Sequence, residues 1–129
     1  MAIKLTIFIK KRDDISFEEF SKYWRETHGK LFVSCGLAAK YTIKYAQYHV
    51  LHDPEVVGKL KKAGFQTLEY DGIGEFWFES LEKMEELFVD ETTVKVMEPD
   101  ELKFTRREEW KMMIGEVTEQ YCAGERSAN

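Results

Sequence analysis

Cysteine, proline and long apolar runs are scarce in this sequence. Its two cysteines, Cys35 and Cys122, lie far apart and match no metal-ligand spacing. Such thiols are typical of a reducing compartment, so we expect a cytoplasmic protein. No stretch approaches the roughly 18 consecutive apolar residues of a membrane span. The apolar residues near the N-terminus alternate with polar ones, unlike the core of a signal peptide. We therefore expect no association with a membrane.

A concentrated basic surface is also missing. The formal net charge is −5, and the densest basic run, residues 10–12, stands at the end of an expected strand. Nucleic-acid binding requires a clustered positive face, so we expect no nucleic-acid partner. The glycine patterns that bind dinucleotides or nucleoside triphosphates are absent, and so is the nucleophile elbow of many hydrolases. The sequence therefore predicts no nucleotide cofactor.

Hydrophobic and aromatic residues are plentiful instead. The chain has 129 residues, of which 43% are hydrophobic and 14% aromatic. These values suit one globular domain with a proper core. We expect this domain to occupy residues 1–120, followed by a small, polar and flexible tail over residues 121–129.

The order of the expected elements indicates one architecture. Four segments alternate between apolar and polar side chains, as half-buried strands do: 3–10, 40–50, 73–79 and 110–117. Helical periodicity marks residues 17–29 and 81–91. The segment 54–63 is expected to be a short amphipathic helix or an irregular excursion, and 100–108 a short helical turn. Pro99 and Asp100 are interpreted as a break between 81–91 and 100–108. The order is that of an α+β, ferredoxin-like βαββαβ domain, a four-stranded antiparallel sheet with helices on one face. A second copy would cover the other face, so we expect a homodimer.

The first expected helix has an aromatic face. A capping box at Ser16 begins it, Phe20, Trp24 and His28 recur at helical spacing, and Gly29 weakens or ends it. Burial would disfavour a charged His28, whereas the C-terminal end of a helix would favour it. This imidazole could therefore donate or accept a proton near neutral pH. The alternative is a buried histidine that is satisfied by one backbone carbonyl.

Three polar side chains share one face of the second expected strand. Tyr45, Gln47 and His49 are each two residues apart, which places them roughly 6.5–7 Å apart along that face. Buried strand faces usually carry aliphatic side chains, so a ligand could be the partner of these polar groups. An exposed face at a dimer rim is the alternative. His49 and His52 lack the spacing and the neighbouring ligands of a metal pair, so we expect no metal site.

Taken together, these patterns resemble one protein family. The motifs are Phe20-x-x-Tyr23-Trp24-x-x-x-His28, Tyr45-x-Gln47-x-His49, Asp71-Gly72 before Glu75-x-Trp77, and Asp100-Glu101-x-x-Phe104. Their combination resembles the EthD family of the dimeric α+β barrel superfamily, and most of all the fungal EthD-domain enzymes of aromatic polyketide pathways. The resemblance extends over residues 3–120.

The resemblance implies an assembly and a type of site. It implies a homodimer whose sheets face each other, and a pocket between sheet and helices that uses neither a metal nor an organic cofactor. Family members include decarboxylases of anthraquinone-type polyketide acids and some dehydratases. The matching positions give four candidate catalytic residues, His28, Tyr45, His49 and Asp71.

Our leading hypothesis is a lyase that decarboxylates an aromatic polyketide acid of the anthraquinone or anthracenone type, by general acid–base catalysis, in secondary-metabolite biosynthesis. His28 or His49 would protonate the substrate, and Tyr45 would hold a carbonyl or phenol oxygen. Five neighbours are expected to bind a flat polycyclic substrate: Phe20, Tyr23, Trp24, Gln47 and Trp77. The alternatives are a dehydratase or cyclase in the same pocket, a cofactor-free oxygenase, and a non-catalytic protein that binds aromatic ligands.

Overall fold

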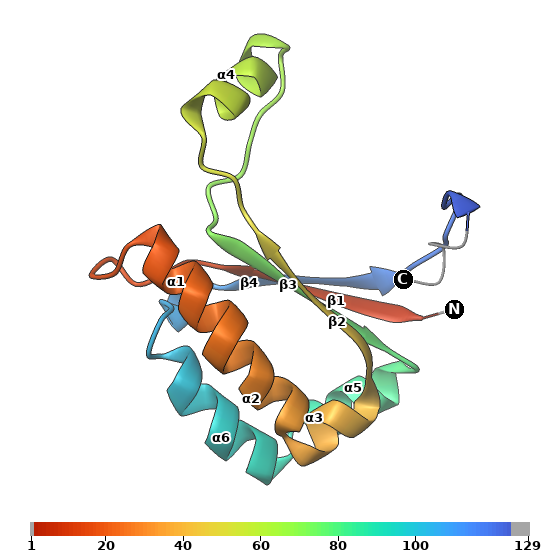
Figure 1. Ribbon diagram of the computed structural model, residues 1–129. Helices are drawn as coiled ribbons and strands as arrows, with labels where there is room; N and C mark the ends of the chain where they lie inside the picture. Colours follow the sequence, from red (N-terminus) through yellow and green to blue (C-terminus); the bar gives the residue numbers. More distant parts are fainter. Residues whose placement is uncertain (1, 125–129) are drawn as a thin grey trace.

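Within residues 2–124, which the computed structural model describes, four antiparallel strands form one sheet (Figure 1). In chain order they are β1 (Ile3–Ile9), β2 (Thr42–His49), β3 (Gly72–Phe78) and β4 (Lys111–Glu116). They lie side by side in the order β2-β3-β1-β4. This order, with helices between β1 and β2 and between β3 and β4, confirms the predicted ferredoxin-like α+β fold. The tail expected over residues 121–129 lies mostly outside the described residues.

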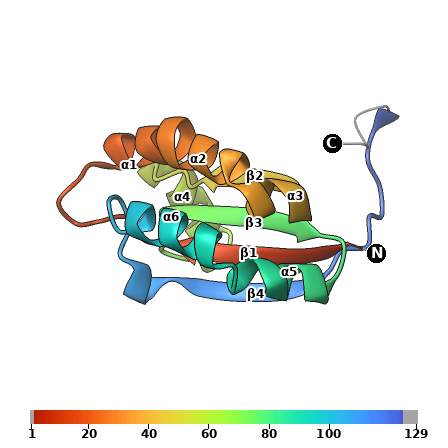
Figure 2. The same ribbon diagram turned by 90° about the horizontal axis from the view of Figure 1, so that it is seen from below.

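Helices cover one face of the sheet, as Figure 2 shows. The first group consists of α1 (Phe17–Tyr23), the π-helical turn η1 (Trp24–His28), α2 (Gly29–Ser34) and α3 (Gly36–Tyr41). The second group consists of α5 (Leu81–Phe88), α6 (Glu91–Glu101) and the 3-10 turn η2 (Arg107–Glu109). The expected capping box at Ser16 is present and begins α1.

Strand alternation assigns the side chains of the sheet to two environments. Leu5, Ile7 and Ile9 of β1 are buried beneath the helices. The intervening side chains lie on the opposite, open face, where Trp77 of β3 sits between the ammonium groups of Lys4 and Lys44. These are 4.8 and 4.6 Å from the centre of its ring. The core therefore lies on one side of the sheet, between the strands and the helical layer.

More of the chain is helical than the sequence patterns indicated. The first helix was expected over residues 17–29 or for one further turn. Gly29 keeps helical backbone angles, and the helical path continues to Ser34, as the longer alternative has it. The helix α3 was not expected at all. The supposed break at Pro99 and Asp100 forms the last turn of α6. Pro99 has no N–H to donate to the carbonyl of Lys95, so the helix lacks one backbone hydrogen bond there, but its path still continues to Glu101.

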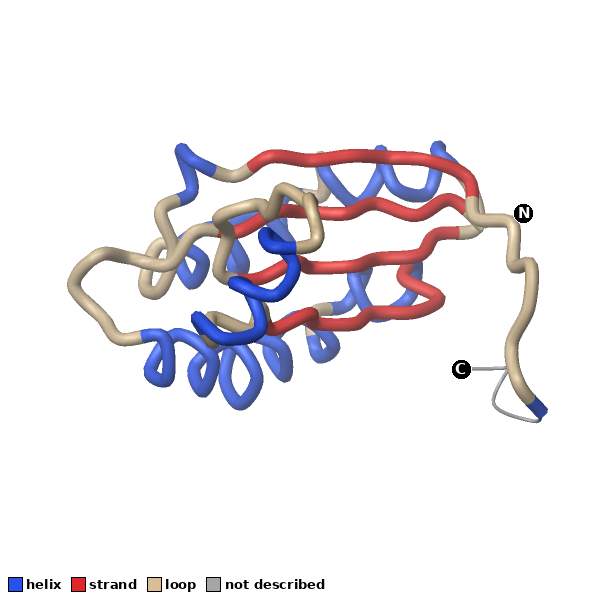
Figure 3. The backbone as a smooth tube through the Cα atoms, turned by 90° about the horizontal axis from the view of Figure 1, so that it is seen from above, coloured by secondary structure: helices blue, strands red, loops and turns tan. Residues whose placement is uncertain are grey.

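The helix α4 (Pro54–Lys62) stands apart from the rest of the molecule. It lies on the open side of the sheet, in an arm between β2 and β3 (Figures 1 and 3). Asp53 caps its N-terminus and none of its residues is buried. Nothing over residues 2–124 forms a helix that is long and apolar enough to cross a membrane.

Candidate active site

A cavity of about 340 Å³ lies between the helical layer and the sheet. This volume falls in the range of small-molecule pockets, about 300–1,000 Å³. Most of its wall is apolar or aromatic: Leu5, Ile7, Ile9, Trp24, Phe32, Phe76, Phe78, Leu87 and Met97. A few polar side chains interrupt this wall, among them His28 and Tyr45. The pocket that the resemblance implied therefore has a counterpart in the structure.

His28 lies at the end of η1 and is paired with a carboxylate from another helix. Its Nδ1 is 2.7 Å from Oδ2 of Asp100 in α6. Tyr23 donates its hydroxyl to Oδ1 of the same carboxylate at 2.5 Å. Because a carboxylate only accepts, Nδ1 of His28 carries the proton and Nε2 keeps a lone pair. No group within residues 2–124 hydrogen-bonds Nε2, so this nitrogen is available to a ligand in the cavity.

Burial determines how these groups titrate. It lowers the pKa of His28, although the hydrogen bond and the charge of Asp100 oppose the shift. Burial and the neighbouring Asp100 raise the pKa of Tyr23 to about 12. His28 is therefore neutral at neutral pH, and Tyr23 remains a donor. A neutral imidazole that is oriented by a buried carboxylate is a suitable general base.

Tyr45 of β2 contributes a phenol to the same cavity. Its ring packs against those of Phe32 and Phe76, at centroid distances of 4.9 and 5.0 Å. Gln47 donates an N–H to its oxygen at 2.8 Å, and the indole of Trp24 also hydrogen-bonds it. Burial raises the pKa of Tyr45 despite these two donors, so the phenol is neutral. Its own O–H can then be donated to a ligand.

His49 does not line this cavity. Its ring packs against Trp24 at a centroid distance of 4.8 Å, and its nitrogens bond Ser21 and Gln47. Burial, followed by the charge of Arg25, lowers the pKa of His49. The expectation that His28 and His49 converge on one hollow is therefore wrong. His49 does share a strand face with Tyr45, but the indole of Trp24 packs against that face, and His49 reaches the cavity only through hydrogen bonds.

Two aromatic residues that were predicted to bind the substrate, Phe20 and Trp77, lie outside this cavity. Phe20 is fully buried in the core, where it packs on Trp24 and Phe104 at 5.6 and 5.7 Å. Trp77 lies on the open face of the sheet, because it alternates with Phe76 and Phe78 of β3. A substrate between sheet and helices would contact neither ring. Phe32 and Phe76 form that wall in their place.

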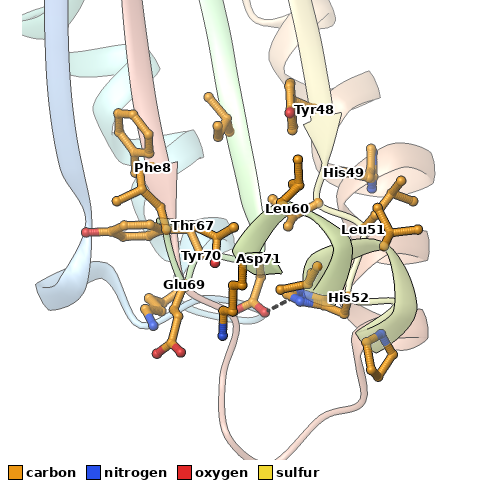
Figure 4. Close-up of a pocket in the computed structure, with 18 of the residues that line it drawn as sticks. Phe8, Tyr48, His49, Leu51, His52, Leu60, Thr67, Glu69, Tyr70 and Asp71 are labelled. Atoms are coloured by element: carbon orange, nitrogen blue, oxygen red, sulfur yellow. Dashed lines mark ion pairs between the residues drawn. The ribbon is translucent and has the colours of Figure 1, made fainter. Parts of the chain in front are cut away.

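Asp71 belongs to a different hollow, of about 1130 Å³, beneath the α4 arm (Figure 4). Its carboxylate accepts the backbone N–H of Lys11 at 2.8 Å, and its Oδ1 is 3.1 Å from Nε2 of His52. Aromatic and aliphatic side chains such as Tyr48 and Leu60 line much of this hollow. The structure therefore separates Asp71 from the predicted catalytic residues His28 and Tyr45.

Asp100 was named only within the family motif and as part of a break, and it was not predicted as a site residue. Its carboxylate is buried and accepts hydrogen bonds from two predicted site residues, His28 and Tyr23. The signal was present, because Thr93, Met97 and Asp100 are spaced as one face of a helix. This periodicity was not recognised, because Pro99 was interpreted as a break in the helix.

Metal ligands do not gather anywhere in the part of the chain that the structure describes. Over residues 2–124, no three His, Cys, Asp or Glu side chains cluster so that they could hold a metal ion. Cys35 is buried, Cys122 is half-buried, and neither forms a disulfide. His49 and His52 engage Gln47 and Asp71 respectively.

Several solved structures are similar to this one. An EthD (ethyl tert-butyl ether d) family protein from Bacillus halodurans is 16% identical, with a TM-score of 0.63 over 92% of this chain and 100% of that one. A dimeric ferredoxin-like protein of unknown function from Bacteroides fragilis is 11% identical, with a TM-score of 0.60 over 90% and 96%. Hydroxynitrile lyase from Passiflora edulis is 8% identical, with a TM-score of 0.61 over 94% and 97%. At identities this low, the structural similarity shows a shared fold alone.

The family is shown by the sequence itself. No curated protein matches the chain. The family model of the EthD domain, however, matches residues 12–108. This region is most of the chain and includes His28, Tyr45 and Asp100. The chain therefore belongs to the EthD domain family.

Proposed function

We propose that this protein is a cofactor-independent lyase that decarboxylates an aromatic polyketide acid of the anthraquinone or anthracenone type, as a step of secondary-metabolite biosynthesis. The observation that carries the proposal is the buried pair of His28 and Asp100, whose imidazole lines a mostly apolar cavity of about 340 Å³. Membership in the EthD family supports it. A hydroxynitrile lyase of the same fold is in keeping with lyase chemistry in this architecture.

In the proposed reaction, His28 moves one proton from oxygen to carbon. Its Nε2 takes the proton of a phenol that is ortho to the carboxylate, and the imidazolium returns this proton to the ring carbon that bears the carboxylate. The bond between ring and carboxylate then breaks, its electron pair flows back to the phenolate oxygen, and carbon dioxide leaves. A proton from water finally converts the phenolate into the phenol. Asp100 stabilises the transient imidazolium and holds the required tautomer.

Tyr45 has the complementary role of a hydrogen-bond donor. Its neutral O–H would bond the phenolate oxygen on which negative charge develops. The cavity is mostly apolar, so this bond would be stronger than the same bond in water. Phe32, Phe76 and Trp24 would flank the flat ring system. His49 and Gln47 act through Tyr45 and do not contact the substrate.

We further propose that two copies pair through the open face of the sheet and that the protein is cytoplasmic. The open face exposes large apolar side chains such as Tyr48 and Met113, and the edge strand β4 is exposed along its whole length. The neighbour from Bacteroides fragilis is described as dimeric. Sedimentation should give twice the mass of the 15.2 kDa chain. A monomer at micromolar concentration would contradict the pairing.

The reaction is tested with purified protein and a hydroxyanthracenone carboxylic acid. Wild-type protein should release carbon dioxide, which a coupled assay measures, and leave a product that has lost the carboxyl group. The variant His28→Ala should lose a factor of about 10²–10⁴ in kcat, the usual contribution of a well-placed acid–base group. The matched control is His52→Ala, which removes the imidazole beneath the α4 arm and should retain activity. No carbon dioxide from the wild type, or equal rates for the two variants, would refute the proposal.

A further inference from the structure

A chain of hydrogen bonds runs from the backbone of η1 to the cavity. It begins at the carbonyl oxygen of Trp24, which accepts the N–H of Gly29 in the π-helical turn and a side-chain N–H of Gln47 at 2.8 Å. A carbonyl oxygen only accepts, so the end of Gln47 beside it must be the NH2 group. The amide oxygen of Gln47 consequently faces His49.

The direction of every other bond follows from this one. The amide oxygen of Gln47 accepts from Nε2 of His49 at 2.9 Å, so Nε2 carries a proton. In the neutral imidazole, Nδ1 is then an acceptor, and Ser21 donates its hydroxyl to it at 2.5 Å. The second N–H of Gln47 is left to bond the oxygen of Tyr45 at 2.8 Å. Tyr45 therefore accepts a hydrogen bond from Gln47, and its own O–H remains available to a ligand in the cavity.

We propose that Gln47, oriented by Trp24 and His49, fixes Tyr45 as a donor and so selects ligands that present a carbonyl or phenolate oxygen to this end of the cavity. The inference rests on the proposed function in treating Tyr45 as the group that faces the ligand. Gln47 is a positioning residue, because it does not line the cavity. Ligands with a donor group at this position are disfavoured, since they would compete with Gln47 for the oxygen of Tyr45.

Gly29 provides the space that this arrangement needs. A Cβ atom at position 29 would lie 2.7 Å from Nε2 of Gln47 and 3.1 Å from the carbonyl oxygen of Trp24. An alanine there would displace the amide of Gln47, the flexible end of its side chain. At Gly36, by contrast, a Cβ would meet nothing within 4 Å. The pair Gly29→Ala and Gly36→Ala can therefore separate loss of the hydrogen-bond chain from the general effect of alanine in a helix.

Two tricyclic probes test the inference by binding alone. 9-Fluorenone has a carbonyl group, and fluorene is the matched hydrocarbon without it. In Tyr45→Phe we expect fluorenone to bind roughly three- to tenfold more weakly, the usual worth of one hydrogen bond, and fluorene to bind as before. Gln47→Glu should reproduce this result, because its carboxylate accepts from Tyr45 and reverses the bond. The double variant should be no worse than either single one.

The carbonyl stretching frequency of bound fluorenone gives a signature that a loss of packing would not produce. It should be lowered by the hydrogen bond in the wild type and in Gly36→Ala. It should rise in Tyr45→Phe, Gln47→Glu and Gly29→Ala. If Gln47→Glu folds poorly, Gly29→Ala still tests the inference, because alanine has a higher helix propensity than glycine.

The outcomes separate this inference from the proposed reaction. If Tyr45→Phe changes the frequency but Gln47→Glu and Gly29→Ala do not, Gln47 does not orient Tyr45 and the inference is wrong. If no variant changes it, Tyr45 is not the donor that faces the ligand, and the inference is equally wrong. Absence of carbon dioxide release by the wild type would end the decarboxylase proposal and leave these binding results intact.

Discussion

Two histidine–aspartate pairs within residues 2–124 occupy very different surroundings. The nitrogen–oxygen distance is 2.7 Å for His28 and Asp100 and 3.1 Å for His52 and Asp71. The side chains of the first pair are only 9% and 7% exposed, whereas those of the second are 44% and 14% exposed. The same two functional groups are thus enclosed at one place and open to water at the other.

The difference shows that surroundings decide what such a pair can do. The ring of Phe104 packs on His28 at a centroid distance of 4.9 Å and excludes water from it. The hydroxyl of Tyr23 holds the carboxylate of Asp100 in place. The ring of His52 packs against that of Phe17 at a centroid distance of 4.6 Å, but solvent reaches the imidazole and screens its interaction with Asp71. An exposed pair contributes little to orientation. We therefore expect proton transfer at the enclosed pair and a structural role for the open one.

The largest expected effect comes from changing the carboxylates. In Asp100→Asn, an amide N–H facing His28 would force the proton onto Nε2, and the cavity would lose its base. We expect kcat to fall by about 10²–10⁴. Asp71→Asn is the matched control beneath the α4 arm and should change kcat less than threefold. Steady-state kinetics of both variants will check this, and similar losses in the two would invalidate the contrast.

The next largest effect is expected at Tyr45. Loss of its O–H in Tyr45→Phe removes a donor to the developing oxyanion, and such donors contribute about 10²–10³ in kcat. Tyr48 is the matched control, because it lies on the same strand but is 54% exposed on the open face. Tyr48→Phe should be nearly neutral in an activity assay. A Tyr45→Phe enzyme with wild-type kcat would remove this tyrosine from the mechanism.

A pair of glycines extends the comparison to stability. A Cβ at Gly72 would lie 2.5 Å from Cζ3 and 2.9 Å from Cη2 of Trp24, a side chain that is 2% exposed. Gly72→Ala should therefore destabilise the protein by about 1–3 kcal/mol, the usual effect of overpacking. Gly58 of α4 has nothing within 4 Å of such a Cβ. Gly58→Ala should stabilise by about 0.4–1 kcal/mol. Urea unfolding of both variants measures the difference, and equal midpoints would argue against a tightly packed wall at Trp24.

The smallest effect concerns the pH dependence of stability. Burial lowers the pKa of His28 in the folded state below the ordinary value of about 6.5 that it has when unfolded. As the pH falls through that value, the unfolded state takes up the proton first. The contribution of neutral His28 is therefore complete above about pH 6.5 and is lost progressively below it.

Unfolding free energies at pH 7.5 and pH 5 will check this expectation. The wild type should lose more stability between these values than His28→Gln does, by at most about 1.4 kcal/mol for each pH unit. An identical pH dependence in wild type and His28→Gln would mean that His28 titrates normally.

Local patterns were enough to predict the architecture. Alternation over a few residues marked each strand, and a capping box at Ser16 marked the start of the first helix. Spacing by two also placed Tyr45, Gln47 and His49 on one face, where the structure links them by hydrogen bonds. These features depend on neighbours in the chain, and for that reason sequence periodicity reports them.

Only the tertiary structure decided which groups form the site. Asp100 meets His28 across 72 positions of sequence, Trp24 packs between His49 and the cavity, and Trp77 lies on the far side of the sheet. Such contacts depend on how the helices pack against the sheet and on which side chains fill the space between the two layers. Packing between distant segments has no period in the sequence. For that reason only His28, Tyr45 and Trp24 of the nine predicted site residues line the cavity, and their partners were not foreseen.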